Sequence, residues 1–257
     1  MIVKTTISSL WLAPIPEAEK RLAAILDSAP EGTEIFFRAD DIGAPGDNCR
    51  RMMEIFRTHQ IPLHMAVTPA WLSESRWVTL KEWAGNDDIF CWHQHGWRHV
   101  NHQQTGKKGE FGTGRTKADK KEDLAKGAVK LEKIMGDDFQ LFFTPPWNRF
   151  DPETAEALAE LGFKAVSRSS GEMKKVPLPD TLPDIFINVD LHTRSEADPA
   201  ESWNALMDEF EAAVETGRVG VMLHHQRMND AAFEFLDTCL SMVARRNGLH
   251  LFRIISL

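Results

Sequence analysis

Short apolar runs alternate with longer amphipathic stretches through most of the chain, and this alternation predicts strands and helices in turn. The runs that we interpret as strands are Glu34–Phe37, Leu63–Val67, Ile89–Trp92, Gln140–Phe143, Lys164–Val166, Ile185–Val189, Val219–Leu223 and His250–Ile254. Strands that alternate with helices usually form a parallel sheet. The pattern therefore predicts an α/β fold, a distorted (β/α) barrel of seven or eight parallel strands, with an open doubly wound sheet as the alternative.

Several of the predicted helices have clear ends in the sequence. Asp151-Pro152 and Asp198-Pro199 each combine an N-cap residue with a proline at the first helical position, and Gly162 and Gly217 follow where these helices should end. A charged helix with inward apolar residues is predicted over Ala118–Met135. No linker or internal repeat divides the chain, so we expect residues 1–257 to form one domain.

The composition is that of an ordinary globular protein and excludes several classes of function. Hydrophobic residues make up 42% and charged residues 26% of the 257 residues, which excludes a disordered chain. The formal net charge is -8, so phosphate backbones meet no basic surface and we expect no nucleic-acid partner. No apolar run approaches the roughly 18 residues of a membrane span, so we expect no membrane association.

The cysteines and the N-terminal residues bear on the cellular compartment. Cys49, Cys91 and Cys239 are odd in number and far apart, which argues against a disulfide framework and favours a reducing compartment. Residues Met1–Pro14 carry a single lysine and lack the small-residue cleavage site of a signal peptide. We therefore expect a cytoplasmic protein.

Polar and reactive side chains follow the ends of most predicted strands. The successive clusters are Arg38, Asp40 and Asp41; His93, His95 and His99; Thr144 to Asn148; Ser167 and Arg168; Asp190 and His192; and His224 to Arg227. Because the carboxyl ends of parallel strands lie on one face of the fold, these clusters should meet there. The sequence therefore predicts a site built from carboxylates and imidazoles.

The adjacent carboxylates Asp40 and Asp41 have two interpretations. Asp is common in turns and at helix N-caps, so the pair has an ordinary structural explanation. Adjacent carboxylates at the end of a strand also divide two tasks, one binding a metal ion and the other accepting a proton. The two residues alone leave both interpretations open.

Four of the ten histidines of the chain lie between His93 and His102. His95 and His99 are four residues apart and can place two imidazoles on one cation. A ligand set that combines His99 with His102 is also open. His93 shares a face with His95 if the strand continues, where it would support a ligand rather than bind the metal.

Three further features each allow more than one interpretation. His224 and His225 end an apolar strand, so each is a candidate for acid catalyst, metal ligand or core residue. Asp190 follows another strand, where it would orient such a histidine and raise its pKa, or cap a turn. The glycine-rich segment Gln103–Arg115 is either a solvated surface loop or a mobile lid over the site.

Taken in order, these clusters resemble the motifs of the polysaccharide deacetylase family, which is carbohydrate esterase family 4 with its NodB-homology domain. The matching residues are Arg38-Ala-Asp-Asp41, His95-Gly-Trp-Arg-His99, Phe143-Thr-Pro-Pro-Trp147-Asn148, Ala157–Phe163, Asp190 and Val221-Met-Leu-His224. The resemblance covers about residues 34 to 225 and implies a distorted (β/α) barrel, in agreement with the strand pattern.

The resemblance implies a hydrolase with one divalent metal ion. By that resemblance, Asp41, His95 and His99 hold the cation, with zinc as the first expectation. One carboxylate and two imidazoles also suit cobalt, nickel and iron. The bound metal would lower the pKa of a water toward ~7 and polarise the acyl oxygen.

The same resemblance implies roles for the neighbouring residues. Asp40 would accept the proton of the water as general base, and His224, with Asp190 as its partner, would protonate the leaving amine. A backbone N–H near Pro146 and Trp147 would help to hold the oxyanion.

Two positions depart from the family pattern. The third motif of the family usually carries an arginine that holds the catalytic aspartate, and this chain has Thr144 there. Arg38 or Arg168 is the expected replacement. The fourth motif usually has a tryptophan soon after its aspartate, and Asp190-Leu-His192 has none.

Several residues are expected at the substrate. They are Pro146, Trp147, Thr144, Trp97, Arg168 and His225. Trp97 and Trp147 are the aromatic candidates for stacking on a sugar ring, with core packing as the alternative.

The first expected function is removal of an acyl group, with acetyl as the first expectation, from the nitrogen of an amino sugar or oligosaccharide. An intracellular saccharide fits a chain without a signal peptide better than a wall polymer does. The alternatives are hydrolysis of another C–N bond, such as that of a cyclic imide or ureide, removal of an O-acetyl group, and non-catalytic carbohydrate binding. A small molecule or oligosaccharide is thus the expected partner, and formation of a homo-oligomer stays open.

Overall fold

The strands of the computed structural model occur where the apolar runs predict them, and several of them have different ends. The structure describes residues 6–13 and 17–253. Its strands are β1 (Glu34–Ile42), β2 (Leu63–Val67), β3 (Phe90–His95), β4 (Phe139–Thr144), β5 (Ala165–Ser169), β6 (Asp184–Ile187), β7 (Val189–Asp190), β8 (Arg218–Leu223) and β9 (His250–Leu251). β1 continues through both aspartates, and the run predicted over Ile185–Val189 is divided at Asn188. The predicted end of the last strand, Ile254, lies outside the described residues.

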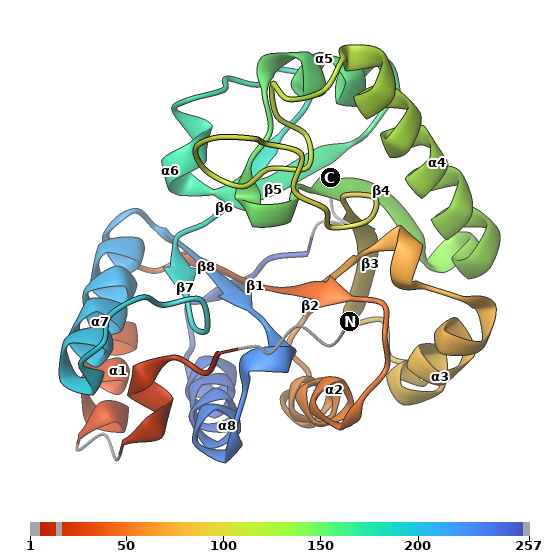
Figure 1. Ribbon diagram of the computed structural model, residues 1–257. Coiled ribbons are helices and arrows are strands. Elements are labelled where there is room, and N and C mark those ends of the chain that lie inside the picture. The colour runs from red at the N-terminus through yellow and green to blue at the C-terminus, as the bar shows by residue number, and fades with distance from the viewer. Residues whose placement is uncertain (1–5, 14–16, 254–257) are drawn as a thin grey trace.

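The strands form a nearly closed (β/α) barrel (Figure 1). Their spatial order is β6-β5-β4-β3-β2-β1-β8-β7, with β9 beside the start of β1. Every pairing along this path is parallel. The predicted distorted barrel is thereby confirmed, and the open doubly wound sheet is not adopted.

One segment closes the barrel by changing its partner at Asn188. Before this residue β6 pairs with β5, and after it β7 pairs with β8. Asn188 donates its backbone N–H to the carbonyl of Gly220 and accepts the N–H of Gly220 on Oδ1, both at 2.9 Å. A Cβ at Gly220 would lie 2.5 Å from the Phe36 ring and closer still to the carbonyl of Phe186, so the seam requires glycine.

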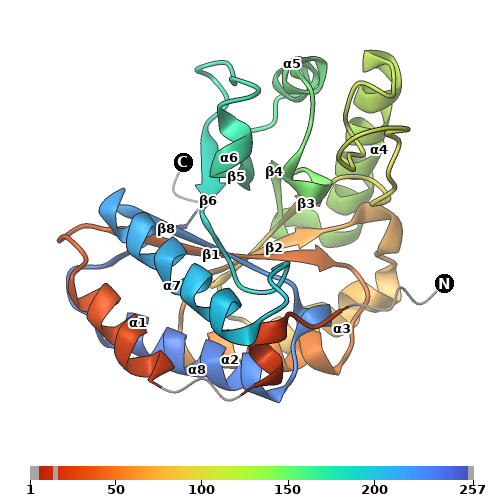
Figure 2. The same ribbon diagram turned by 60° about the vertical axis from the view of Figure 1, so that its left-hand side comes forward.

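Helices cover the outside of the barrel (Figures 1 and 2). They are α1 (Ala18–Asp27), α2 (Asp47–His59), α3 (Glu74–Ala84), α4 (Lys117–Met135), α5 (Pro152–Glu160), α6 (Ser170–Met173), α7 (Pro199–Glu215) and α8 (Asp230–Arg245). Asp151 and Asp198 accept the backbone N–H groups of Thr154 and Glu201, so both predicted N-caps are confirmed. In Figure 2, α1, α2, α3, α7 and α8 lie on one side of the strands and α4, α5 and α6 on the other.

Alternation along the strands separates the main core from the barrel interior. On β1, Ile35, Phe37 and Ala39 pack into the core under the helices, whereas Phe36 packs with apolar residues inside the barrel. Arg38 shares the face of Phe36, because side chains two residues apart point the same way. It reaches β5 and β8 across the interior through Ser167 and Met222. The inside of the barrel is therefore apolar toward the amino ends of the strands and charged toward their carboxyl ends.

The three cysteines are buried and form no disulfide, as their spacing predicts. Burial raises the pKa of each thiol to about 12, so the thiols stay protonated and unreactive at neutral pH. No helix within the described residues has both the length and the apolarity that crossing a membrane requires.

Candidate active site

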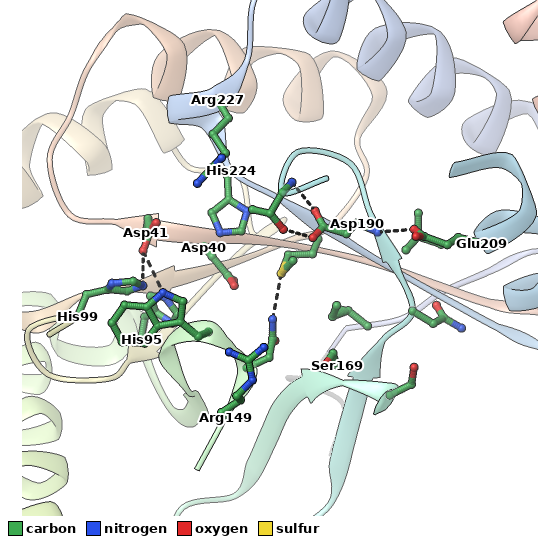
Figure 3. A pocket seen from close by; sticks show the side chains of 18 residues that line it. Asp40, Asp41, His95, His99, Arg149, Ser169, Asp190, Glu209, His224 and Arg227 are labelled. Carbon is green, nitrogen blue, oxygen red and sulfur yellow. Dashed lines mark hydrogen bonds and ion pairs between the residues drawn. The ribbon is translucent and has the colours of Figure 1, made fainter. Parts of the chain in front are cut away.

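The carboxyl ends of the strands surround a pocket of about 520 Å³ (Figure 3). Its walls come from the ends of β1, β3, β5, β7 and β8 and from a short 3₁₀ helix, η4 (Pro146–Asn148). The pocket is lined by the six residues that the sequence suggested for metal binding or acid–base catalysis: Asp40, Asp41, His95, His99, Asp190 and His224. The expected face of the barrel thus brings the carboxylates and imidazoles together.

Asp41, His95 and His99 form a cluster with the composition of a metal site. Asp41 Oδ1 lies 3.4 Å from His95 Nε2 and 3.2 Å from His99 Nε2, and the three ligand atoms all lie within 4.8 Å of one another. Asp41 Oδ1 is buried and has no hydrogen-bond partner among the described residues. Two imidazoles and one carboxylate that converge on such an atom suit a divalent cation.

The protonation of the two imidazoles bears on this fit. His95 Nδ1 donates a hydrogen bond to the carbonyl of Thr144 at 3.0 Å, which leaves Nε2 as the ligand atom. Burial lowers the pKa of His99 to about 4, so this ring is neutral at pH 7 and offers a lone pair. Burial alone would raise the pKa of Asp41, but the neighbouring imidazoles of His95 and His99 outweigh it and hold the pKa well below its usual range. Burial lowers the pKa of His95, but the carboxylates of Asp40 and Asp41 outweigh it and raise the pKa, so a cation bound at Nε2 takes the place of a proton there.

The backbone around the site is held in an unfavourable conformation. Asp41, His99, Trp147 and Asn148 have φ angles of 62°, 58°, 57° and 61°, in the left-handed region that side chains with a Cβ rarely adopt. Each such residue costs about 1–3 kcal/mol and persists only where the surrounding packing fixes it. Two of the four are members of the metal cluster, so the strain is concentrated where the chemistry is expected.

Arg38 holds the second carboxylate of the pair. Its Nε and Nη2 donate to the two oxygens of Asp40 at 2.7 and 2.8 Å, and the guanidinium is fully buried. It also donates to Asn148 Oδ1 at 2.7 Å and to Ser167 Oγ at 2.9 Å. Burial raises the pKa of Asp40, but the charge of Arg38 outweighs it and the pKa is lowered. Asp40 is therefore ionised and fixed beside the metal cluster.

The sequence profile of the polysaccharide deacetylase family matches residues 28–166, which is more than half of the chain. The chain belongs to the polysaccharide deacetylase family. This agrees with the resemblance of the motifs. No curated protein matches the sequence significantly.

Solved structures of the family share the fold. A candidate polysaccharide deacetylase from Mycobacterium smegmatis superposes with a TM-score of 0.64 at 16% identity, over 89% of this chain and 92% of that one. A family 4 carbohydrate esterase from Streptomyces lividans, solved in complex with acetate, gives 0.51 at 13% identity, over 88% and 93%. A family 4 pseudoenzyme from Bacillus anthracis gives 0.50 at 14% identity, over 86% of this chain and 64% of that one.

The arginine that holds Asp40 in this family member comes from β1 and not from the third motif. Arg38 contacts Asp40 directly, whereas Arg168 donates to Asp184 Oδ2 at 2.8 and 2.6 Å and stacks on Phe150. The expectation that Arg168 holds the base or contacts substrate is therefore wrong. The reason is alternation: Ser167 points into the barrel, so its neighbour Arg168 points out.

Asp190 does not contact the ring of His224. Asp190 Oδ1 accepts the N–H groups of His192 and Thr193 at 3.0 and 2.9 Å, and Oδ2 accepts the hydroxyl of Thr193. His224 Nδ1 is buried without a hydrogen-bond partner among the described residues, and its backbone N–H donates to His192 Nδ1 at 3.0 Å. The direct pairing implied by the resemblance is thus not formed, because the turn after β7 uses both oxygens of Asp190.

Of the six residues expected at the substrate, one lines the pocket. This residue is Trp147, whose ring centroid lies 4.3 Å from that of His99. Thr144 is buried behind the metal cluster, where its hydroxyl contacts His93 Nε2 at 2.8 Å. Trp97 is partly buried and packs against the apolar cluster that contains Leu124 and Leu158, in agreement with the alternative interpretation of that tryptophan. Pro146 and His225 are buried and lie outside the lining.

The far wall of the pocket contains residues that the sequence analysis missed. Ser169 and Glu209 line it opposite the metal cluster (Figure 3), and Asn188 and Arg149 also line the pocket. Ser169 could have been found from Ser167, because the two share a face of β5. Asn188 is a polar interruption of an apolar run. Glu209 lies on α7 and has no local signal in the sequence.

Proposed function

We propose that the protein is a metal-dependent hydrolase that removes an acyl group, acetyl in the first instance, from the nitrogen of an amino sugar or oligosaccharide. The observation that carries this proposal is the Asp41–His95–His99 cluster next to an aspartate that a buried arginine keeps ionised. His224 lines the same pocket, and its charge contributes to the lowered pKa of both aspartates. A pure binding site needs neither a base nor an acid.

The chain supplies the groups that such a hydrolysis needs. A divalent cation held by Asp41, His95 and His99 would acidify a water and polarise the acyl oxygen. Asp40 would take the proton of this water, since each of its oxygens has a lone pair left beyond the hydrogen bond from Arg38. His224 would give a proton to the departing nitrogen, because an amine leaves poorly unless it is protonated.

The rest of the pocket supports a saccharide as substrate. Ser169, Ser170, Asn188 and Thr193 offer hydroxyl and amide groups on the wall away from the metal cluster, and Trp147 offers an aromatic face. A pocket of about 520 Å³ suits a small molecule or the end of an oligosaccharide. We also propose a cytoplasmic location, which the number and spacing of the cysteines support.

The test distinguishes the role of the metal ligand Asp41 from that of the general base Asp40. Wild type, Asp40→Asn and Asp41→Asn are loaded with zinc or cobalt, their bound metal is measured, and acetate release is followed on N-acetylated amino-sugar oligomers. The proposal expects about one equivalent of metal in wild type and D40N, turnover in wild type only, and loss of both in D41N. Wild type that holds metal and releases no acetate from this panel would contradict deacetylation.

A panel of cyclic imides and ureides is assayed beside the acetylated sugars. Turnover of these compounds alone would identify the other C–N hydrolase as the correct function. The presence of a pseudoenzyme among the solved structures makes this comparison necessary, because a family fold does not guarantee activity.

A further inference from the structure

The turn between the two histidine ligands has an unusual backbone. The chain leaves β3 at His95 and reverses over Gly96 and His99, with φ angles of 59° and 58°. Gly96 donates its N–H to the carbonyl of Thr144 at 3.2 Å, while the N–H groups of Trp97, Arg98 and His99 converge on one carboxylate. Successive N–H groups that converge in this way form an anion-binding nest.

That carboxylate belongs to Glu110, a residue with no exposed surface. Its Oε1 accepts the N–H of Arg98 at 2.7 Å, and its Oε2 accepts those of Trp97 and His99 at 3.1 and 3.3 Å. A Cβ at Gly96 would lie 2.5 Å from Pro146 Cγ and closer still to Glu110 Oε2, so only glycine lets the carboxylate approach the turn. A buried carboxylate is unfavourable unless it is hydrogen-bonded, and here three backbone donors satisfy it.

The segment that carries Glu110 is fastened to the rest of the fold. Phe111 is fully buried with its ring edge against Phe143 at 5.4 Å between centroids, and its carbonyl accepts the N–H of Asp151 and the hydroxyl of Thr154 at 3.0 and 2.9 Å. None of the residues Gln103–Arg115 lines the pocket. The segment therefore supports the turn between the two histidine ligands (residues 96–99, the metal turn) from outside the pocket. It is neither a fully solvated loop nor a lid.

The three ligands differ in how they are held. Asp41 belongs to β1 and His95 to β3, where His95 is also fixed by the carbonyl of Thr144. His99 lies beyond the strand in a left-handed conformation, and its backbone is held by Glu110. We propose that Glu110 is a positioning residue for the metal site, which fixes the backbone of His99 so that its Nε2 faces Asp41. This inference rests on the proposed metal-dependent function.

The test measures metal affinity and not turnover. Glu110→Gln keeps the size of the side chain but replaces one acceptor oxygen with an NH₂ group that faces the same backbone donors. We expect the affinity for zinc, measured by competition with a chromophoric chelator, to fall about 10–100-fold, as for other residues that orient metal ligands. The visible spectrum of the cobalt-loaded variant should also differ from that of wild type at equal occupancy.

Asp151→Asn is the matched control. Asp151 is also a buried carboxylate that accepts a backbone N–H, that of Thr154 at 3.0 Å. Its own backbone N–H, which D151N retains, is the group that contacts the Glu110 segment, and within the described residues its side chain forms no hydrogen bond with the metal turn. We expect D151N to lower the free energy of unfolding and to leave metal affinity unchanged. Equal losses of affinity in E110Q and D151N would overturn the proposal, because they would show a general loosening of the fold.

A double-mutant cycle shows whether Glu110 acts through His99. In a His99→Ala background, E110Q should cause no further loss of zinc affinity, whereas an undiminished loss would overturn the proposal. If E110Q does not fold, Glu110→Asp takes its place in the cycle, since it draws the carboxylate back by one methylene and keeps the charge. Wild type that binds no metal would instead contradict the proposed function, and this result is obtained before any variant is made.

Discussion

Arg38 and Asp40 are two residues apart on β1, and Arg38 contacts both oxygens of the Asp40 carboxylate, with distances of 2.7 and 2.8 Å. Side chains at this spacing share a face of a strand, so the pair is formed within one strand. The ion pair is almost fully buried, where a charge partner has a large effect on the pKa of the carboxyl group. The proposed general base, Asp40, and the arginine that keeps it ionised are therefore supplied by the same strand.

Arg38→Lys should impair the base while keeping the positive charge. A lysine cannot donate two parallel hydrogen bonds to a carboxylate, so the pKa of Asp40, which Arg38 lowers against the effect of burial, should rise. Since a general base must be ionised, the acidic limb of the kcat/KM profile should move to higher pH, with kcat/KM reduced by up to about 10²-fold. A profile with an unmoved acidic limb would contradict this role.

Relocation of the arginine provides a rescue experiment. Arg38→Thr should lose more activity than R38K, because a buried aspartate without its partner costs about 3–5 kcal/mol. Combining R38T with Thr144→Arg returns the arginine to the position that it usually has in the family. We expect the double variant to exceed R38T in kcat/KM, and bound metal, measured in both, should be unchanged.

Asp190→Asn should have a small effect compared with His224→Gln. The Oδ1 of Asp190 accepts both N–H groups of the turn after β7, and an asparagine retains that oxygen. We expect kcat to fall less than about 10-fold in D190N and about 10²–10⁴-fold in H224Q, the range for loss of an acid catalyst. Similar losses in the two variants, measured at saturating substrate, would show that Asp190 assists His224 during turnover.

Gly96→Ala should destabilise the protein and weaken metal binding together. The added Cβ meets Pro146 and Glu110, and the residue must also keep a φ of 59°. Gly162→Ala is the control, because its φ of 76° is similar and its Cβ would meet nothing within 4 Å. Urea unfolding should show a loss of about 1 kcal/mol for G162A and a larger one for G96A, with reduced zinc affinity in G96A alone.

His64 should make the fold sensitive to acid at a point away from the metal cluster. It is buried inside the barrel, and its Nδ1 donates to the carbonyl of Phe37 at 2.9 Å. Burial lowers its pKa to about 4, below the 6.5 of the unfolded chain. The unfolded state therefore binds the proton first, and the free energy of unfolding should fall by up to about 3 kcal/mol as the pH drops from 6.5 to 4.

The comparison variant for this effect is His64→Leu. It should be less stable than wild type at pH 7.5, since the Phe37 carbonyl loses a donor. Its urea midpoint should change less with pH than that of wild type, and the stabilities of the two proteins should converge toward pH 4. Parallel pH profiles would show that His64 does not contribute.

The sequence predicts the strand-borne part of the site well. Asp41 and His95 end apolar runs, and parallel strands bring such ends together, so both could be placed without a structure. Arg168 follows Ser167 on β5, and strand alternation turns its side chain away from the barrel interior, so a place at the substrate does not follow from its position after the strand. The use of Asp190 in a local turn was not predicted either, because a carboxylate at a strand end serves a cap or a catalyst with the same sequence signal.

Glu110 shows what the sequence could not predict. It lies in a glycine-rich segment without periodicity, and its partners are backbone N–H groups that carry no sequence signal of their own. The burial of the neighbouring Phe111 depends on Phe143, far away in the chain. Contacts of this kind follow from the folded backbone, so only the structure identifies them.

The seam at Asn188 gives the two sides of the pocket different mechanical properties. The metal side is built on the ladders of β1, β2 and β3, with an irregularity between Ala39 and Ile42, whereas the opposite side is joined to β8 through the two residues of β7 and the backbone and side-chain amides of Asn188. Asn188 itself lines the pocket. The metal ligands thus stand on longer strand pairings than the wall that faces them, and we expect changes in substrate size to be accommodated most easily at the wall with the shorter pairings.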